Sequence, residues 1–209
     1  TLSWFVDDLA APAGCLHAAL VTSRVARGRI RSLDLGEVLA SPGVVAVYTH
    51  RDVPGLNEVG HVLKDQPLLA VDQVEYIGQP LALVVAESHL QAWQAAARGR
   101  ADIEELPAVF DPREALAQGM IHGQKRILVS GDPDTAFEKC HHVVQGSLAS
   151  GPQEHFYFET QRALAVPTEH DTIKVHASTQ SPGAYHRHLA EVLGLPMHKV
   201  ELDIRRLGG

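Results

Sequence analysis

The chain has 209 residues, of which 45% are hydrophobic and 21% are charged. This composition is typical of soluble globular proteins and excludes an intrinsically disordered chain. The length suits one large domain or two small ones. The formal net charge is −7 and the basic residues are scattered, whereas nucleic-acid binding requires a basic face. We therefore expect no nucleic-acid partner.

The N-terminal residues include early acids and no basic segment, so we expect no secretory signal peptide. No apolar run approaches the roughly 20 residues of a membrane-spanning helix, and we expect no membrane association and a cytoplasmic location. The two cysteines, Cys15 and Cys140, lie far apart. Their spacing matches neither a disulfide framework nor a zinc or iron–sulfur ligand set.

The first half of the chain predicts short strands that alternate with short helices. Ser88 and Gln91 have the spacing of a helix capping box, and the helix that follows places Leu90, Trp93 and Ala97 on one apolar face. Residues 50–76 read as loop. The expected strands are residues 15–21, 44–49, 80–86 and 101–106, and the other expected helices begin at residues 34 and 113.

Downstream of a glycine-containing stretch that ends near residue 124, the pattern starts again, and we place the main domain boundary there. A short helix is expected from Asp132 to Phe137, and a longer one begins at Ser181-Pro182 and ends at Gly194. The apolar stripe of the longer helix consists of Tyr185, Leu189, Val192 and Leu193. Extended segments are expected at residues 142–149, 155–166, 172–177 and 200–206.

One nine-residue segment carries a specific motif. Gly151-Pro-Gln-Glu-His-Phe-Tyr-Phe-Glu159 resembles the signature of the large, molybdenum-cofactor-binding subunits of the xanthine dehydrogenase and molybdenum hydroxylase family. Arg205-Arg-Leu-Gly-Gly209 resembles the start of the family's glycine-rich cofactor loop. The other stretches that agree in order and spacing are residues 16–21, 73–80, 177–182 and 193–200. The resemblance covers essentially the whole chain.

The resemblance implies an α+β fold in two parts. Residues 1–124 are expected to form an α/β hammerhead domain of the aldehyde oxidase and xanthine dehydrogenase type. Residues 125–209 are expected to form the beginning of the first molybdenum-cofactor-binding domain, interrupted at its glycine-rich loop. On this interpretation the chain is the N-terminal part of a large subunit.

The family's activity implies oxidative hydroxylation of purines such as hypoxanthine and xanthine, with water as the oxygen source. The implied cofactors are molybdenum–molybdopterin, with FAD and 2Fe–2S clusters in partner subunits or domains, so a hetero-oligomer is expected. The 209-residue chain alone is expected to be inactive. Two alternatives remain open: the large subunit of an aldehyde or nitrogen-heterocycle oxidoreductase, and a purely structural or interface module.

The resemblance assigns three residues to the cofactor. Gln153 matches the glutamine that contacts the molybdenum centre, and an uncharged amide N–H suits a metal oxo group. Gly208 and Gly209 match the first glycines of the cofactor loop, where the missing Cβ lets backbone amides approach an anion. No catalytic residue is expected in this chain, because the family's base lies beyond the loop. Glu154 and Glu159 are interpreted as residues that anchor strands.

The 13 histidines invite a metal-site hypothesis. The closest pairs are His141-His142 and His186/His188, and neither pair has the i, i+4 spacing of a helical zinc site. We expect these histidines and His155 to be solvated or hydrogen-bonded within the structure. Cys140 has no recognisable base partner and is expected to be a small buried residue.

Overall fold

The computed structural model describes residues 5–60, 63–121, 123–157, 159 and 161–206. These residues divide into two compact units, and each is described separately. The larger unit comprises Thr1–Ala108 and Phe156–Gly209, and the smaller comprises Val109–His155. Within the described residues, no helix has the length and apolarity required to span a bilayer.

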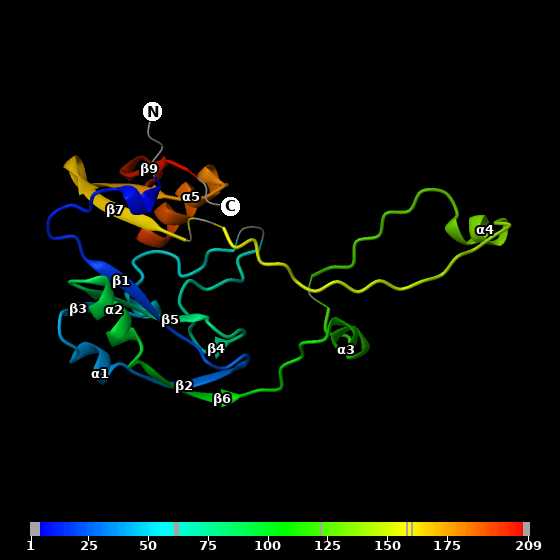
Figure 1. Cartoon of the computed structure of the whole chain (residues 1–209), viewed down its shortest axis with the longest axis horizontal. Helices are drawn as coiled ribbons and strands as arrows, with labels where there is room; N and C mark the ends of the chain where they lie inside the picture. Colours follow the sequence, from blue (N-terminus) through cyan, green and yellow to red (C-terminus); the bar gives the residue numbers. More distant parts are fainter. Residues whose placement is uncertain (1–4, 61–62, 122, 158, 160, 207–209) are drawn as a thin grey trace. The chain divides into compact units, whose positions relative to one another are not determined.

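Strands and helices alternate along the chain (Figure 1), as expected for an α+β fold. The strands are β1 His17–Thr22, β2 Gly28–Asp34, β3 Val44–Tyr48, β4 Gln73–Val74, β5 Pro80–Ala86, β6 Arg100–Glu105, β7 Ala163–Thr168, β8 Thr172–Ala177 and β9 Val200–Ile204. The α-helices are α1 Gly36–Leu39, α2 His89–Ala96, α3 Pro112–Ala117, α4 Pro133–Glu138 and α5 Pro182–Leu193. Single 3-10 turns are η1 Val6–Asp8, η2 His50–Asp52, η3 Glu169–Asp171 and η4 Met197–Lys199.

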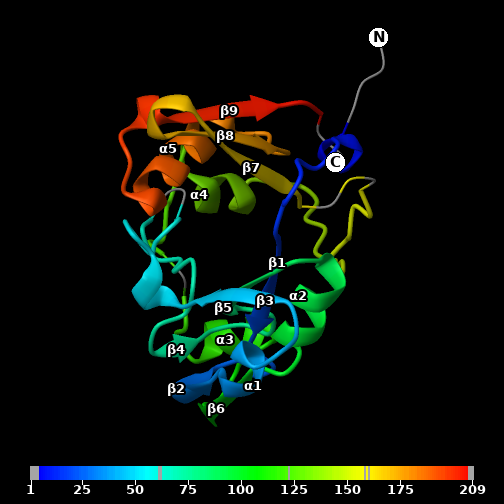
Figure 2. The ribbon, with the colours of Figure 1, turned by 90° about the vertical axis from the view of Figure 1, so that its left-hand side faces the viewer.

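The first 108 residues form two antiparallel sheets with the strand orders β1-β5-β3 and β4-β2-β6. Figure 2 shows the two sheets in the lower part of the view, with α2 beside β1. The alternating side chains of β5 place Ala82, Val84 and Ala86 in the fully buried interior. Ala82 and Val84 pack with Val38 and Val74 in one aliphatic cluster. This cluster is the hydrophobic core of the first 108 residues.

Helix α2 buries a different face from the predicted one. Leu90 and Trp93 are 60% and 62% exposed, and the buried residues are Ala92, Ala95 and Ala96. Alanine lets the helix axis lie close to β1 and β5, where bulky side chains would not fit. The capping prediction is confirmed at Ser88, whose side chain accepts a hydrogen bond from the backbone N–H of Gln91 at 3.3 Å.

The third sheet has the order β7-β8-β9, with β7 and β8 antiparallel and β8 and β9 parallel. Helix α5 connects the two parallel strands, as such a crossover requires. Gly194 ends α5 in the left-handed conformation with φ of 64°, which confirms the predicted stop. Ser181 precedes the helix as predicted, but its side chain makes no capping hydrogen bond.

The extended segments predicted at residues 142–149 and 155–166 are only partly confirmed. The described residues from 139 to 162 belong to no strand, and pairing begins at Ala163. The smaller unit contains α3 and α4, each opened by an aspartate whose carboxylate accepts from the backbone of the first turn. Figure 1 shows α4 between two long extended segments of this unit. Leu128, Val144 and Leu148 lie almost fully exposed along these segments.

The loop after η2 satisfies the C-terminal end of α5. The last carbonyls of a helix have no partner within the helix. Here the carbonyl of Val192 accepts a hydrogen bond from the backbone N–H of Gly55, and the carbonyl of Glu191 accepts one from Leu56, both at 2.9 Å. The Lys64 side chain also donates to the Glu191 carboxylate at 2.6 Å. The loop that follows η2 is therefore attached to α5, the helix that connects β8 and β9.

Replacing Gly55 should break this attachment. A Cβ on residue 55 would lie 1.9 Å from the carbonyl oxygen of Glu191 and 2.6 Å from the backbone nitrogen of Gly194. Since neither backbone atom can yield, we expect Gly55→Ala to lower the free energy of unfolding by roughly 2–3 kcal/mol in chemical denaturation. Gly146→Ala is the control, because nothing lies within 4 Å of its Cβ position. Equal stability of the two variants would contradict the attachment.

The ion pair at Glu191 predicts a pH dependence. The hydrogen bond from Lys64 lowers the pKa of Glu191 below its ordinary value of 4.5. A lowered pKa in the folded state stabilises the protein above pH 4.5, and this contribution disappears as the pH falls through the lowered pKa. The melting-temperature difference between wild type and Glu191→Gln should therefore vanish at acidic pH. Glu75→Gln, at an exposed position without an ion pair in the described structure, is the control for the loss of a surface carboxylate.

Candidate cofactor-contact segment and its anchor

Gln153 lies in a segment without regular secondary structure. Residues 150–156 are all exposed, and no hydrogen bond within the described structure reaches the side-chain amide of Gln153. Phe156, three residues further, is 94% exposed and has a φ of 50°, in the region that disfavours side chains with a Cβ. The amide of Gln153 is thus available to an external acceptor. An exposed amide without a partner in the described structure is what the predicted contact with the molybdenum centre requires.

The end of the same segment is firmly held. Glu159 is only 5% exposed. Its Oε1 accepts from the backbone N–H of Val6 at 2.6 Å, and its Oε2 accepts from the hydroxyl of Ser178 at 2.8 Å. A buried carboxylate must be compensated by donors, and two short charge-assisted bonds provide this. Glu159, which the sequence predicts to anchor a strand, lies on no strand itself, and its carboxylate instead holds Val6 and the residue that follows β8.

The N-terminal residues next to Val6 reach the end of β9. The guanidinium of Arg206 lies 5.6 Å from the centroid of the Phe5 ring, within the range of a cation–π contact. The preceding Arg205 is held separately, because its guanidinium pairs with the carboxylate of Asp203 at 3.0 Å. Both arginines are exposed, but each has a partner within the described structure.

Gly208 and Gly209 lie outside the described residues. Gln153 and the last described residue, Arg206, belong to different compact units. The expected proximity of the glutamine amide to the glycine pair therefore stays a prediction.

The histidines and cysteines carry no metal site in the described part of the chain, where no group of three or more candidate ligands comes together. His186 is structural: its Nε2 lies 2.6 Å from the carbonyl oxygen of Val200 and 3.0 Å from that of Met197. The prediction that Cys140 is buried is wrong. Cys140 is exposed after the end of α4, with its thiol 3.3 Å from the carbonyl of Ala136.

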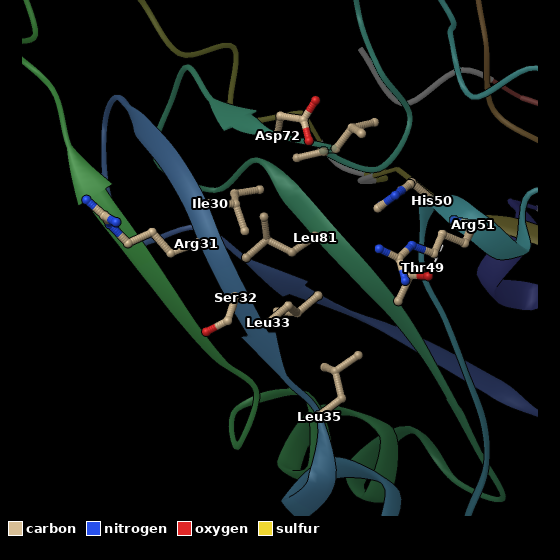
Figure 3. A pocket seen from close by; sticks show the side chains of 12 residues that line it. Ile30, Arg31, Ser32, Leu33, Leu35, Thr49, His50, Arg51, Asp72 and Leu81 are labelled. Carbon is tan, nitrogen blue, oxygen red and sulfur yellow. Dashed lines mark hydrogen bonds between the residues drawn. The ribbon is translucent and has the colours of Figure 1, made fainter.

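A hollow of about 360 Å³ lies in the hammerhead part. Figure 3 shows the aliphatic side chains of Ile30, Leu33 and Leu81 between β2 and β5, with η2 contributing the polar side of the hollow. Gln153 is not among the described residues that line it.

The sequence alone did not indicate the partners of Glu159. Val6 is 153 positions away and contributes only a backbone N–H, which leaves no trace in the residue type. Ser178 is part of the matched stretch 177–182, but the sequence assigns it no partner. The Arg162–Asp7 ion pair, with 3.2 Å between Nε and Oδ1, was not predicted either, because the two residues lie far apart in the sequence.

Comparison with known proteins defines the class to which this architecture belongs. The family model of the aldehyde oxidase and xanthine dehydrogenase a/b hammerhead domain matches residues 3–107. The molybdopterin cofactor-binding domain matches residues 118–209. The chain belongs to the aldehyde oxidase and xanthine dehydrogenase family of molybdenum hydroxylases.

Individual relatives agree with this assignment. The chain is 38% identical over 209 residues to a xanthine dehydrogenase of Oryza sativa subsp. japonica, with 98% of this chain covered. It is also 38% identical over 207 residues to aldehyde oxidase 2 of Cavia porcellus, with the same coverage. In both cases the chain spans 15% of the relative's length.

A solved structure extends the agreement to three dimensions. The aldehyde oxidoreductase from Desulfovibrio gigas superposes with a TM-score of 0.84 at 29% sequence identity. The match covers 95% of this chain and 24% of the other. The predicted α+β fold, with a hammerhead domain followed by a molybdopterin-binding domain, is confirmed.

Proposed function

We propose that this chain is part of a xanthine dehydrogenase type hydroxylase that oxidises purines such as hypoxanthine and xanthine, with water as the source of oxygen. The observation that carries the proposal is the match of both domains in order, together with the segment Gly151–Glu159 that bears Gln153. Xanthine dehydrogenases are among the relatives that the chain resembles, which makes a purine a candidate substrate.

The residues of this chain fit a molybdenum–molybdopterin group. Gln153 presents a neutral amide without a competing partner in the described structure, and an amide N–H can donate to a metal oxo group. When bound, the group supplies the redox chemistry, and the protein supplies positioning and electrostatics. We assign Gly208 and Gly209 to the same cofactor, because their backbone amides can approach an anionic ligand closely. The catalytic base is assigned to another part of the protein.

The proposed partners follow from the same family membership. FAD and 2Fe–2S clusters are assigned to partner domains or subunits, in a cytoplasmic hetero-oligomer. We place the boundary between the hammerhead domain and the cofactor-binding domain near residue 124. This chain on its own is proposed to be inactive, because a pre-organised site needs groups that it does not contain.

A second candidate is an aldehyde or nitrogen-heterocycle oxidoreductase. The 38% identity to aldehyde oxidase 2 of Cavia porcellus equals that to the rice xanthine dehydrogenase, so identity does not discriminate between them. A third candidate is a structural or interface module without a cofactor role. The exposed apolar side chains of Leu128, Val144 and Leu148 favour a surface that another polypeptide covers.

Metal content and substrate turnover separate the three candidates. The whole protein that carries this chain, purified with its partners, should contain molybdenum and should hydroxylate xanthine in preference to an aromatic aldehyde. Preference for the aldehyde would favour the second candidate. A fully assembled complex without molybdenum would favour the interface module and refute the main proposal.

Gln153 should matter for turnover more than for folding. Because its side chain is exposed and makes no hydrogen bond in the described structure, Gln153→Ala should leave the melting temperature unchanged. Loss of a donor next to the metal centre should reduce kcat/KM roughly 10- to 100-fold. Gln145→Ala, at an exposed position in the same unit, should keep wild-type kinetics. If both variants turn over like wild type, Gln153 does not contact the centre.

A further inference from the structure

The buried carboxylate of Glu159 joins three segments that are far apart in the sequence. Oε1 accepts from the backbone N–H of Val6 at 2.6 Å, and Oε2 accepts from the Ser178 hydroxyl at 2.8 Å. Ser178 directly follows β8, and Val6 opens η1. These two hydrogen bonds, called here the Glu159 clamp, hold the N-terminal segment 5–8 against the third sheet.

Segment 5–8 in turn contacts the end of β9. Phe5 precedes the clamped Val6, and the Arg206 guanidinium lies 5.6 Å from the Phe5 ring centroid. A second link, the Arg162–Asp7 ion pair at 3.2 Å, reinforces the same segment. The clamp is thereby connected to Arg206, two residues before Gly208, and it also fixes the chain six residues after Gln153.

We propose that Glu159 is a positioning residue of the cofactor centre. Through Phe5, its clamp holds the chain at Arg206, the last described residue before the predicted glycine-rich loop. The inference rests on the proposed function for the cofactor, but the clamp itself rests only on the contacts above. Glu159 acts through other residues and is not itself assigned a contact with substrate or cofactor.

The chemistry of the clamp predicts which substitution preserves it. Glutamine at position 159 keeps a carbonyl oxygen that can accept from the Val6 N–H. Its NH₂ group can donate to the Ser178 hydroxyl oxygen, since a hydroxyl both donates and accepts. Alanine removes both acceptors and leaves a buried N–H without its partner. Glu159→Gln should therefore restore what Glu159→Ala loses.

The test compares four variants of the whole protein: Glu159→Ala, Glu159→Gln, Val175→Ala and Glu169→Gln. Val175 is buried in β8 and contributes no atom to the clamp, so it controls for a loss of stability, and Glu169 is an exposed carboxylate in the same part of the fold. Hydrogen exchange of residues 5–8 reports on the clamp independently of activity. The electron paramagnetic resonance signal of the reduced molybdenum centre reports on positioning.

Glu159→Ala should exchange roughly tenfold faster in residues 5–8 and should change the resonance signal, with both effects reversed in Glu159→Gln. Val175→Ala and Glu169→Gln should leave the signal unchanged. If hydrogen exchange of residues 5–8 is unchanged in Glu159→Ala, the clamp does not exist. If exchange is faster but the resonance signal is unchanged, Glu159 has only a structural role, and the proposed positioning role is wrong. If Glu159→Gln behaves like Glu159→Ala, the hydrogen-bond argument is wrong. Wild-type protein without molybdenum refutes the proposed function instead, while the exchange result still decides whether the clamp exists.

Discussion

A charged group in a protein interior is stable only when donors replace its lost water. At Glu159 the replacement comes from a backbone N–H and a hydroxyl in two remote parts of the chain. These two bonds hold η1, Glu159 and the end of β8 together. They also bear on Arg206, because its partner Phe5 directly precedes the clamped Val6. Together with the Arg162–Asp7 ion pair, the carboxylate of Glu159 holds segment 5–8 in place.

The second constraint is the end of α5. Its terminal carbonyls are satisfied by the backbone of residues 55 and 56, and the contact is so close that only glycine fits at position 55. The two backbone hydrogen bonds of this attachment involve no charged atom, unlike those of the clamp. They require no particular side chain, but they leave no room for a Cβ at position 55. The clamp involves Val6 near the beginning of the hammerhead sequence, and the attachment to α5 involves Gly55 and Leu56 near its middle. Together they tie the first domain to the third sheet at both its beginning and its middle.

The sequence predicted the elements whose signals are local. The run Pro80–Ala86, the proline-opened helices and the Gly194 stop are all read from adjacent residues, and the structure confirms them. Strand β2 was missed because a register shift between Ile30 and Ser32 breaks its alternation of apolar and polar residues. The buried face of α2 was misjudged because large apolar residues normally mark the core, whereas here close packing selects alanine. Gln153 was recognised from a motif, but the partners of Glu159 are set by tertiary contacts that no local pattern encodes.

The sequence separation in the clamp also affects the order of folding during synthesis. All six strands of the hammerhead part are complete by Glu105, and N-terminal domains generally fold first as the chain leaves the ribosome. Residues 5–8, however, have their acceptor only after Glu159 and Ser178 have emerged. Residues 5–8 must therefore stay undocked while about 150 further residues are translated. Segment 5–8 consequently joins the third sheet only after the strands that follow it in the sequence have been synthesised.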